Sequence, residues 1–401
     1  MQDCRVHGFG FPALALLTAV GLAGPLLGSL PRFRIPAVIG ELIAGLVVGK
    51  TGFGVVDVGN PTFQLFANIG FALVMFVVGT HVPIRESAMR SALPGALARA
   101  VLSGGMAVVL GIGLAAQFKT GHAALYAVLM ASSSAALALP VIDSLRLRGP
   151  QVIAVTTQIA IADAACIVLL PLVIDFRRAP TAALGALAVA GCALVLFVVM
   201  RAVDRKGWRR RMHVYSENRR FALELRTNLI ALFTLAALAA STHVSIMLAG
   251  FAVGLVLSAV GEPRRLARQL FGITEGFFSP LFFVWLGASL QVRELGSHPK
   301  FILLGVGLGF GAILAHCAGR LLGQPLTLAV LSSAQLGVPV AAATIGMEEH
   351  LLSAGESAAL MFGALVTIVA TSIAGAFAAR GQSAAPAAKP TDSRESSGRG
   401  A

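Results

Sequence analysis

Charged side chains are scarce in this sequence: Asp, Glu, Lys and Arg make up 12% of its 401 residues, whereas hydrophobic residues make up 57%. A soluble domain carries about 25% charged residues, so the composition excludes an ordinary water-soluble protein. A helix that crosses a bilayer needs roughly 20 apolar residues, and uncharged stretches of about this length recur between residues 11 and 379. The sequence therefore predicts a chain that crosses the membrane many times.

Cysteine is also rare, and the motifs of common enzymes are missing from the sequence. Cys4, Cys166, Cys192 and Cys317 have no paired spacing, so neither a disulfide framework nor a zinc site is expected. The sequence contains no HExxH motif, no Walker motif and no GxGxxG run that opens a helix. We therefore expect no enzyme activity and no cofactor.

The net charge of +13 raises the question of a nucleic-acid partner, which would need a contiguous basic face on a soluble domain. Here the basic residues lie between apolar stretches. Most of the 31 Lys and Arg residues fall in one alternate set of connections, as the positive-inside rule predicts for cytoplasmic loops. We therefore expect lipid rather than nucleic acid as the partner, with the N-terminus outside and the C-terminus in the cytoplasm.

The predicted fold is an all-α polytopic membrane protein with about thirteen transmembrane helices. The first apolar stretch is long enough to span the bilayer, so we expect a retained helix rather than a cleaved signal peptide. The expected spans are residues 11–30, 36–49, 63–80, 92–117, 122–143, 150–174, 181–200, 222–241, 244–260, 276–291, 300–322, 324–347 and 355–379.

We predict one transmembrane domain, residues 1–380, followed by a disordered cytoplasmic tail, residues 381–401, that is rich in Ala, Pro and Ser. A basic cytoplasmic loop, residues 201–220, joins two halves, 1–200 and 221–380. MFVVGTHV at 75–82 resembles FVWLGASLQV at 283–292, which favours inverted repeats of the kind found in secondary transporters. The alternative is chance similarity between apolar helices.

Asp163 is the one charged residue in the span 150–174. An ionised carboxylate at the bilayer centre costs roughly 2.5 to 3.5 kcal/mol or more, so such groups usually face a cavity or an ion path. The sequence therefore predicts that Asp163 binds a proton or a monovalent cation. The alternative is a structural carboxylate satisfied by neighbouring hydroxyl groups.

Two segments combine hydroxyl groups with helix-breaking residues. Ser132, Ser133 and Ser134 precede Pro140 in the fifth span, and Ser332, Ser333 and Gln335 precede Pro339 in the twelfth. Broken helices in corresponding positions of two halves are the best sequence indication of a binding site near the bilayer midplane. The alternative is that each serine bonds back to its own turn.

Four further polar residues are weaker candidates for an accessory role. Thr157 and Gln158 lie about one turn from Asp163 on the same helix. His316 lies deep in the eleventh span, where the alternative is a bond to the neighbouring backbone. Glu41 lies near a span end, where the alternative is that it reaches the interface.

Four longer segments resemble bacterial cation:proton antiporters of the Kef-type sodium/hydrogen exchanger family. They are RFRIPAVIGELIAGLVVGKTGFG at 32–54, ANIGFALVMFVVGTHVPIRE at 67–86, ASSSAALALPVIDSLRLRG at 131–149 and SPLFFVWLGASLQV at 279–292. This resemblance covers residues 11–379. It implies a homodimer in the bacterial inner membrane, with two crossed discontinuous helices and an elevator-like mechanism.

The same resemblance implies that Asp163 binds cation and proton in turn and that Ser132, Ser133 and Ser134 form the first helix break. The sequence departs from the family in three places. Ala162 replaces the usual acidic or amide neighbour of the aspartate, no basic residue occurs near Gly311, and Gln335 to Val338 replace an Arg-Gly-Glu segment.

The predicted function is exchange of a monovalent cation, Na⁺ or K⁺, for H⁺, with Asp163 as the shared site and Ser133, Ser134, Gln158 and Gln335 as further ligands. One alternative is a sodium-coupled symporter of an organic anion on the same fold. Another is a channel-like or regulatory membrane protein without coupled exchange.

Overall fold

The computed structural model is helical throughout its regular elements and describes residues 10–29, 37–82, 87–175, 179–207, 215, 219, 221–242, 244–261, 264–290, 293, 299–348 and 350–383. The helices are α1 Phe11–Gly21, α2 Ala23–Gly28, α3 Ala37–Val48, α4 Pro61–His81, α5 Ser87–Phe118, α6 Ala123–Ala131, α7 Ala135–Ser144, α8 Pro150–Ile174, α9 Ala179–Arg205, α11 Leu223–Ser241, α12 Ile246–Val260, α13 Arg264–Ile273, η1 Thr274–Phe278, α14 Ser279–Ser289, α16 Pro299–Cys317, η2 Ala318–Leu322, α17 Leu326–Leu331, α18 Gly337–Glu348 and α19 Ala354–Ser383.

Ten helical stretches in this part of the chain are long and apolar enough to cross a membrane. They correspond to ten of the thirteen expected spans, which confirms an all-helical polytopic membrane protein. Two other expected spans are shorter apolar helices, Ala37–Val48 and Ile246–Val260. The remaining one, 324–347, consists of the two helices α17 and α18. The count of thirteen crossings stays a prediction.

One predicted span begins earlier than expected. Helices α13, η1 and α14 follow one another directly, and the membrane-length stretch begins at Leu266 rather than at residue 276. The expected span starts directly after the charged residue Glu275. This residue instead lies within η1, a five-residue π-helical turn, and such turns are accommodated inside longer helices.

Helix starts follow the local sequence. The side chain of Asn60 accepts hydrogen bonds from the backbone N–H groups of Thr62 and Phe63, and Pro61 occupies the first turn of α4. Gly149, with φ of 113°, precedes Pro150 at the start of α8. Such positive φ values favour glycine, and proline is well suited to the first helical position.

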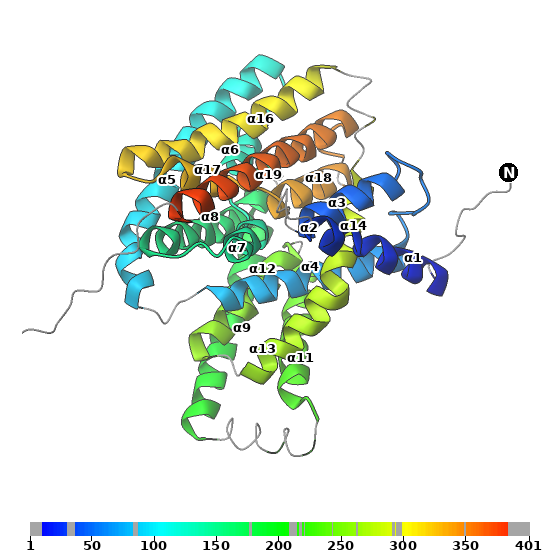
Figure 1. Ribbon diagram of the computed structural model, residues 1–401, viewed down its shortest axis with the longest axis vertical. Helices are drawn as coiled ribbons and strands as arrows, with labels where there is room; N and C mark the ends of the chain where they lie inside the picture. The colour runs from blue at the N-terminus through cyan, green and yellow to red at the C-terminus, as the bar shows by residue number, and fades with distance from the viewer. Residues whose placement is uncertain are drawn as a thin grey trace, which may run out of the picture.

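The helices form two groups. In Figure 1 the first lies at the upper left, and the second extends from its right side, with α1 to α3 and α14, to below it, with α4, α9 and α11 to α13. Helices α5 to α8 and α16 to α19 pack together in the upper group. Helices α1 to α4, α9 and α11 to α14 form the second group, in which α4 packs on α12 and α3 packs on α14. We call the first group the core group and the second the scaffold group.

Glycine allows the closest helix contacts in the scaffold group. A Cβ atom added at Gly79 of α4 would lie 2.8 Å from the Cα of Gly254 on α12. A Cβ atom at Gly287 of α14 would collide with the carbonyl oxygen of Leu42 on α3. Small residues at such crossings are typical of membrane helices, because they let the backbones approach.

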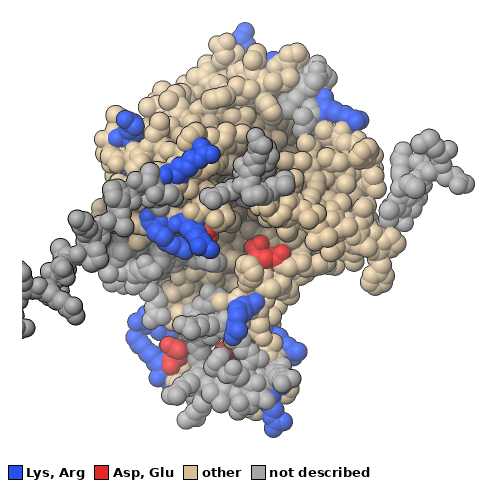
Figure 2. Space-filling model, viewed as in Figure 1, with Lys and Arg blue, Asp and Glu red and all other residues tan. Residues whose placement is uncertain are grey.

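The surface is consistent with a lipid environment. On the face shown in Figure 2, most of the surface belongs to uncharged residues, and Lys and Arg occur in separate small groups. Large apolar side chains are exposed along the outer helices, among them Leu184, Leu187 and Val195 on α9 and Phe310 and Leu314 on α16. The described residues form no continuous basic surface on that face.

Two predicted boundaries differ in detail. Helix α9 continues to Arg205, into the predicted loop 201–220, and most of that loop lies outside the described residues. Helix α19 ends at Ser383, so the first three residues of the predicted tail are helical, and residues 384–401 lie outside the described part.

Candidate functional site

The first helix break lies between α6 and α7. Ser132 ends α6 with φ −69° and ψ 145°, and Ser134 precedes α7 with φ −119° and ψ 107°. Both residues are extended, and all three serines 132–134 are buried. The interruption that the sequence predicts at Ser132, Ser133 and Ser134 is therefore present.

The second break lies between α17 and α18, at residues 332–336. Gln335 and both serines of this segment are buried. Its backbone is held by α19, because the N–H of Gln335 donates to Thr367 Oγ1 over 3.2 Å. The second predicted interruption is also present, and Pro339 lies in the first turn of α18, where its missing N–H costs little.

The two breaks are joined directly. Ser133 Oγ donates a hydrogen bond to the carbonyl oxygen of Ser332 over 2.6 Å. In the other direction, Gln335 Nε2 donates to the carbonyl oxygen of Leu129, also over 2.6 Å. Each break thus supplies a side-chain donor to a backbone carbonyl group beside the other break. The two interrupted helices therefore meet at their breaks.

Asp163 lies where this junction meets α8. The residue is 2% exposed, and its Oδ2 accepts a hydrogen bond from the backbone N–H of Ala135 over 2.9 Å. Ala135 is the first residue of α7, so the carboxylate faces the N-terminus of a half-helix, where the helix dipole favours negative charge. The described residues give Oδ1 no hydrogen bond, which leaves that oxygen available to a proton or a cation.

His316 also reaches the first break. Its Nδ1 lies 3.0 Å from the carbonyl oxygen of Ala312, and its Nε2 lies 3.2 Å from Ser133 Oγ. The bond to the neighbouring backbone that the sequence suggested is therefore present. The contact with Ser133 adds what the sequence could not show, namely that this buried imidazole supports the junction of the two broken helices.

Thr157 and Gln158, which lie about one turn before Asp163 on α8, differ in their hydrogen bonds. Thr157 Oγ1 donates to the carbonyl oxygen of Ile153 over 2.8 Å, which is a bond within its own helix. Gln158 is fully buried, and neither its Oε1 nor its Nε2 has a hydrogen-bond partner among the described residues. Buried polar groups are almost always paired, so Gln158 is the stronger candidate of the two.

The serine side chains at the two breaks also differ in their hydrogen-bond partners. Ser132 Oγ donates to Leu129 within its own turn, and Ser333 Oγ does the same to Val330. Ser134 is buried at the N-cap position of α7 but makes no side-chain cap hydrogen bond there. Only Ser133, among these serines, uses its hydroxyl group to bind across the junction.

Glu41 lies elsewhere in the fold. It is buried on α3, in the scaffold group, where a Cβ atom added at Gly24 of α2 would lie 2.8 Å from its Oε1. The suggestion that Glu41 reaches the interface is wrong, because helix α2 covers it. Its described contacts do not bring it to Asp163.

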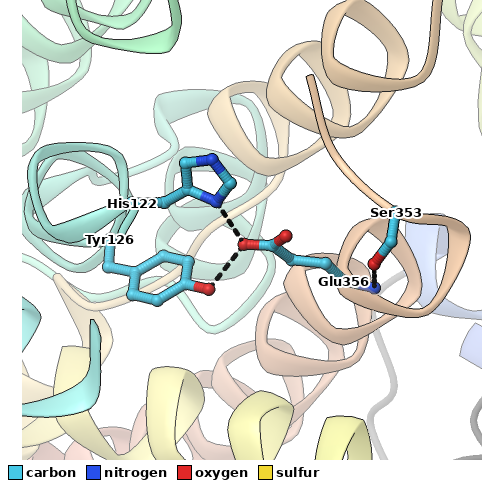
Figure 3. Close-up of polar contacts among 4 residues, drawn as sticks. All are labelled: His122, Tyr126, Ser353 and Glu356. Carbon is cyan, nitrogen blue, oxygen red and sulfur yellow. Dashed lines mark hydrogen bonds and ion pairs between the residues drawn. The ribbon is translucent and has the colours of Figure 1, made fainter. Parts of the chain in front are cut away.

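Sequence reasoning missed a polar cluster formed by His122, Tyr126 and Glu356, which Figure 3 shows. Tyr126 and His122 both contact the buried carboxylate of Glu356. One signal was available: Ser353 and Glu356 have the spacing of a capping box at a helix start. Nothing in the sequence indicated that α6 supplies the partners.

A cavity of about 290 Å³ lies between the two helix groups. Its core-group wall reaches α8 at Pro171 and Ile174, about two and three turns beyond Asp163. The opposite wall comes from the scaffold group and includes Asn68, Phe71, Phe282 and Trp285. No Lys, Arg or His occurs among the described residues that line it, whereas Asp175 does.

Two interrupted helices that meet beside a buried carboxylate, inside a polytopic helical bundle, define a membrane transporter of the secondary type. Comparison with known proteins identifies the particular family. The family described as "Sodium/hydrogen exchanger, transmembrane" matches residues 15–379, and the chain belongs to it.

Three relatives with curated descriptions are 24% to 28% identical to this chain. The chain is 28% identical over 338 residues to the Na⁺/H⁺ antiporter NhaS5 of Synechocystis, a match that covers 79% of this chain and 47% of that protein. It is 28% identical over 313 residues to the glutathione-regulated potassium-efflux system protein KefC of Enterobacter, covering 73% and 47%. The chain thus spans about half the length of these two relatives. The Na⁺/H⁺-K⁺ antiporter GerN of Bacillus cereus is 24% identical over 318 residues, covering 76% and 80%.

The fold is also found in solved structures. The structure of the sodium proton antiporter MjNhaP1 from Methanocaldococcus jannaschii obtained by electron microscopy matches with a TM-score of 0.68, covering 93% of this chain and 98% of that one at 15% identity. A structure of the same antiporter at pH 8 gives a TM-score of 0.62 at 16% identity, covering 92% and 97%. This likeness confirms the predicted antiporter-like fold.

Proposed function

We propose that this chain exchanges a monovalent cation for H⁺ across the cytoplasmic membrane, with Asp163 as the site that both ions share. The observation that carries the proposal is the position of the Asp163 carboxylate, buried at the first N–H of α7 and beside the junction of the two breaks. Family membership supports the same function.

The surroundings of Asp163 suit a small cation better than a larger anion. The carboxylate supplies the charge, and unwound backbone at a helix break supplies carbonyl oxygens of the kind that coordinate Na⁺ in other transporters. Ser133, Ser134, Gln158 and Gln335 are the proposed polar neighbours. Because Gln335 Nε2 and the Ser133 hydroxyl are used to join the breaks, we assign these two residues a positioning role and keep Gln158 as the candidate ligand.

The coupling in this proposal comes from competition. A carboxylate that holds a proton binds a cation poorly, so each ion displaces the other, and only differential binding to two facing states drives exchange. The core group carries Asp163 and both breaks, and a cavity lies between part of it and the scaffold group. This division supports an elevator-like movement of the core group against the scaffold group.

The lining of the cavity favours cation exchange over the organic-anion alternative. An anion would need basic groups in the cavity, whereas its described lining contains Asp175 and no basic side chain. A channel-like or regulatory protein would not need two breaks tied to a single carboxylate. Assembly as a homodimer and an outside N-terminus stay predictions from the sequence.

The test is transport in everted membrane vesicles. Cation-induced changes of internal pH are recorded while Na⁺, K⁺ and Li⁺ are varied, for the wild type and for Asp163→Asn. We expect the variant to insert normally and to lose exchange. Asp143→Asn is the matched control, because Asp143 is an exposed residue 3.6 Å from Arg148, and this variant should keep full exchange. Retained exchange in Asp163→Asn would refute the assignment.

A further inference from the structure

The hydroxyl group of Ser133 lies within hydrogen-bond distance of two partners but has one hydrogen to donate. Its Oγ is 2.6 Å from the carbonyl oxygen of Ser332 and 3.2 Å from Nε2 of His316. All three residues are buried, with exposures of 1% or less, so bulk water does not compete for these contacts. The carbonyl oxygen can only accept a hydrogen bond. The hydrogen positions on the imidazole therefore decide which bonds Ser133 can form.

The other ring nitrogen of His316 determines the tautomer. Nδ1 lies 3.0 Å from the carbonyl oxygen of Ala312, and because that oxygen only accepts, Nδ1 carries the hydrogen. A positive charge on a fully buried imidazole would need a compensating partner. No hydrogen bond or ion pair joins His316 to a carboxylate in the described part of the chain. We therefore take the imidazole as neutral, with Nε2 as an acceptor.

Ser133 thus has two acceptors for a single hydrogen. When the hydrogen points at Ser332, the two breaks are tied together, as the shorter contact indicates. When it turns to Nε2 of His316, Ser133 stays paired, but the carbonyl group of Ser332 loses its donor. Both acceptors are already within reach of the same oxygen. The change therefore needs no movement of the helices, and it leaves no buried donor unpaired.

The carbonyl group of Ser332 has no second donor among the described residues. Ser332 is the C-cap residue of α17, and no backbone N–H of the described chain donates to its oxygen. The carbonyl group of Leu129 at the same junction differs, because it also accepts the N–H and the hydroxyl group of Ser132. Unwound carbonyl groups at helix breaks coordinate Na⁺ in other transporters. Ser332 therefore offers the freer of the two carbonyl oxygens at the junction.

This carbonyl group also lies near the candidate carboxylate. Ser133, which binds it, is two residues before Ala135, whose N–H binds Asp163 Oδ2. The backbone between them is extended at Ser134, and an extended chain advances about 3.3 Å per residue. The Cα atoms of Ser133 and Ala135 are thus about 7 Å apart. The junction therefore offers a cation a charged oxygen and a neutral backbone oxygen in the same neighbourhood.

We propose that the carbonyl oxygen of Ser332 is a ligand of the transported cation and that the Ser133 hydroxyl group covers it until the cation binds. On binding, the hydroxyl hydrogen turns to Nε2 of His316. His316 is therefore a positioning residue that acts through Ser133. The ligand class is a monovalent metal cation that has lost part of its water, because carbonyl oxygens replace hydration. The inference rests on the proposed function, since it adds a ligand to the site at Asp163.

Two substitutions of His316 separate the two bonds of its imidazole. His316→Asn keeps an amide donor for Ala312 but is too short to reach Ser133. His316→Gln places an amide oxygen near the position of Nε2 and gives up the donor to Ala312. In proteoliposomes at fixed pH, we expect His316→Asn to raise the KM for the cation about tenfold with little change in kcat, and His316→Gln to keep the wild-type KM. Tenfold corresponds to about 1.4 kcal/mol, within the range for one unpaired buried donor.

Removing the cover should have the opposite effect on cation binding. In Ser133→Ala the cation no longer displaces a hydrogen bond, so we expect KM to fall about tenfold even though turnover is slower. His316→Asn should no longer raise KM in this background, because the two residues act through one bond. A merely structural role of His316 would raise KM equally in both backgrounds. That result, or a rise in KM in Ser133→Ala alone, would overturn the proposal.

A second measurement does not depend on transport. The melting temperature in detergent is recorded while NaCl or KCl replaces choline chloride at constant ionic strength, because a cation that binds the folded state raises it. The cation concentration at half-maximal shift should rise about tenfold in His316→Asn and stay at the wild-type value in His316→Gln. Equal values in both variants would refute the ligand role of Ser332. Exchange retained in Asp163→Asn would instead refute the proposed function.

Discussion

Ser133 donates its hydroxyl hydrogen to the carbonyl oxygen of Ser332 over 2.6 Å, although the two residues lie 199 positions apart in the chain. Each residue belongs to a break in a helix, where backbone carbonyl groups lose their helical partners. The bond therefore satisfies a carbonyl group of one interrupted helix with a side chain of the other. The stability of each break depends on the presence of the other.

Replacing Ser133 by alanine tests this dependence. The carbonyl group of Ser332 would lose its buried donor, and an unsatisfied buried acceptor costs about 1 to 3 kcal/mol. We expect the Ser133→Ala variant to unfold at a lower temperature in detergent and to exchange ions more slowly. Ser333→Ala is the control, because the Ser333 hydroxyl binds only Val330 in its own turn. Equal stability of the two variants would contradict the prediction.

Gln158 offers a test that separates ligand from structural roles. Its two amide atoms are buried without a partner among the described residues, and each such atom costs about 1 to 3 kcal/mol. Gln158→Met keeps the length of the side chain and removes these atoms, so we expect unchanged or higher thermal stability together with slower exchange. Thr157→Val provides the comparison on the same helix. Normal exchange by Gln158→Met would exclude Gln158 as a ligand.

The contact between α3 and α14 should tolerate no side chain at Gly287. A methyl group there would collide with the Leu42 carbonyl oxygen, which belongs to the backbone and cannot turn aside. Such overpacking typically costs about 1 to 3 kcal/mol. Gly104→Ala, at a site with nothing within 4 Å of the added atom, should be neutral or stabilising by up to about 1 kcal/mol. Thermal unfolding in the same detergent compares the two, and a similar loss in both would count against the packing argument.

The His122–Glu356 pair should also give stability that depends on pH. Because the pKa of His122 is raised by its bond to Glu356, its contribution is complete below the ordinary histidine pKa and is lost as the pH rises through the raised value. The melting temperature of the wild type should therefore exceed that of His122→Gln most at about pH 5.5 and least at about pH 9. A difference that is constant with pH would show that the pair does not titrate.

Much of the fold could be predicted from the sequence, because a helix that crosses lipid has to be a long apolar stretch. Backbone groups in a bilayer must pair within the segment, so long apolar stretches such as residues 150–174 could be read directly as helices. Prediction was weaker where local sequence left two outcomes open. Glu275 looked like the end of an apolar run, yet it lies within η1, inside a helical stretch that begins at Leu266.

Of the candidate site, too, one part could be predicted from the sequence and another part could not. Asp163 and both breaks could be predicted, because a carboxylate in an apolar span and serines followed by proline are local signals. The contacts of Ser133 with Ser332 and His316 could not, since no local pattern specifies which distant helix lies opposite. The same reason hid Glu356, whose partners lie on α6 at a separation of 230 residues or more.

The donor that faces Asp163 is the peptide N–H of Ala135, and this has a consequence for how the site can change. A side-chain donor is removed by a single codon change, whereas a peptide N–H is common to every amino acid except proline. A substitution at position 135 by any residue except proline therefore keeps this donor, and the full burial of Ala135 limits the choice to small side chains. Asp163 thus keeps the Ala135 N–H as a hydrogen-bond partner, although the adjacent residue, Ala162, has no polar side chain.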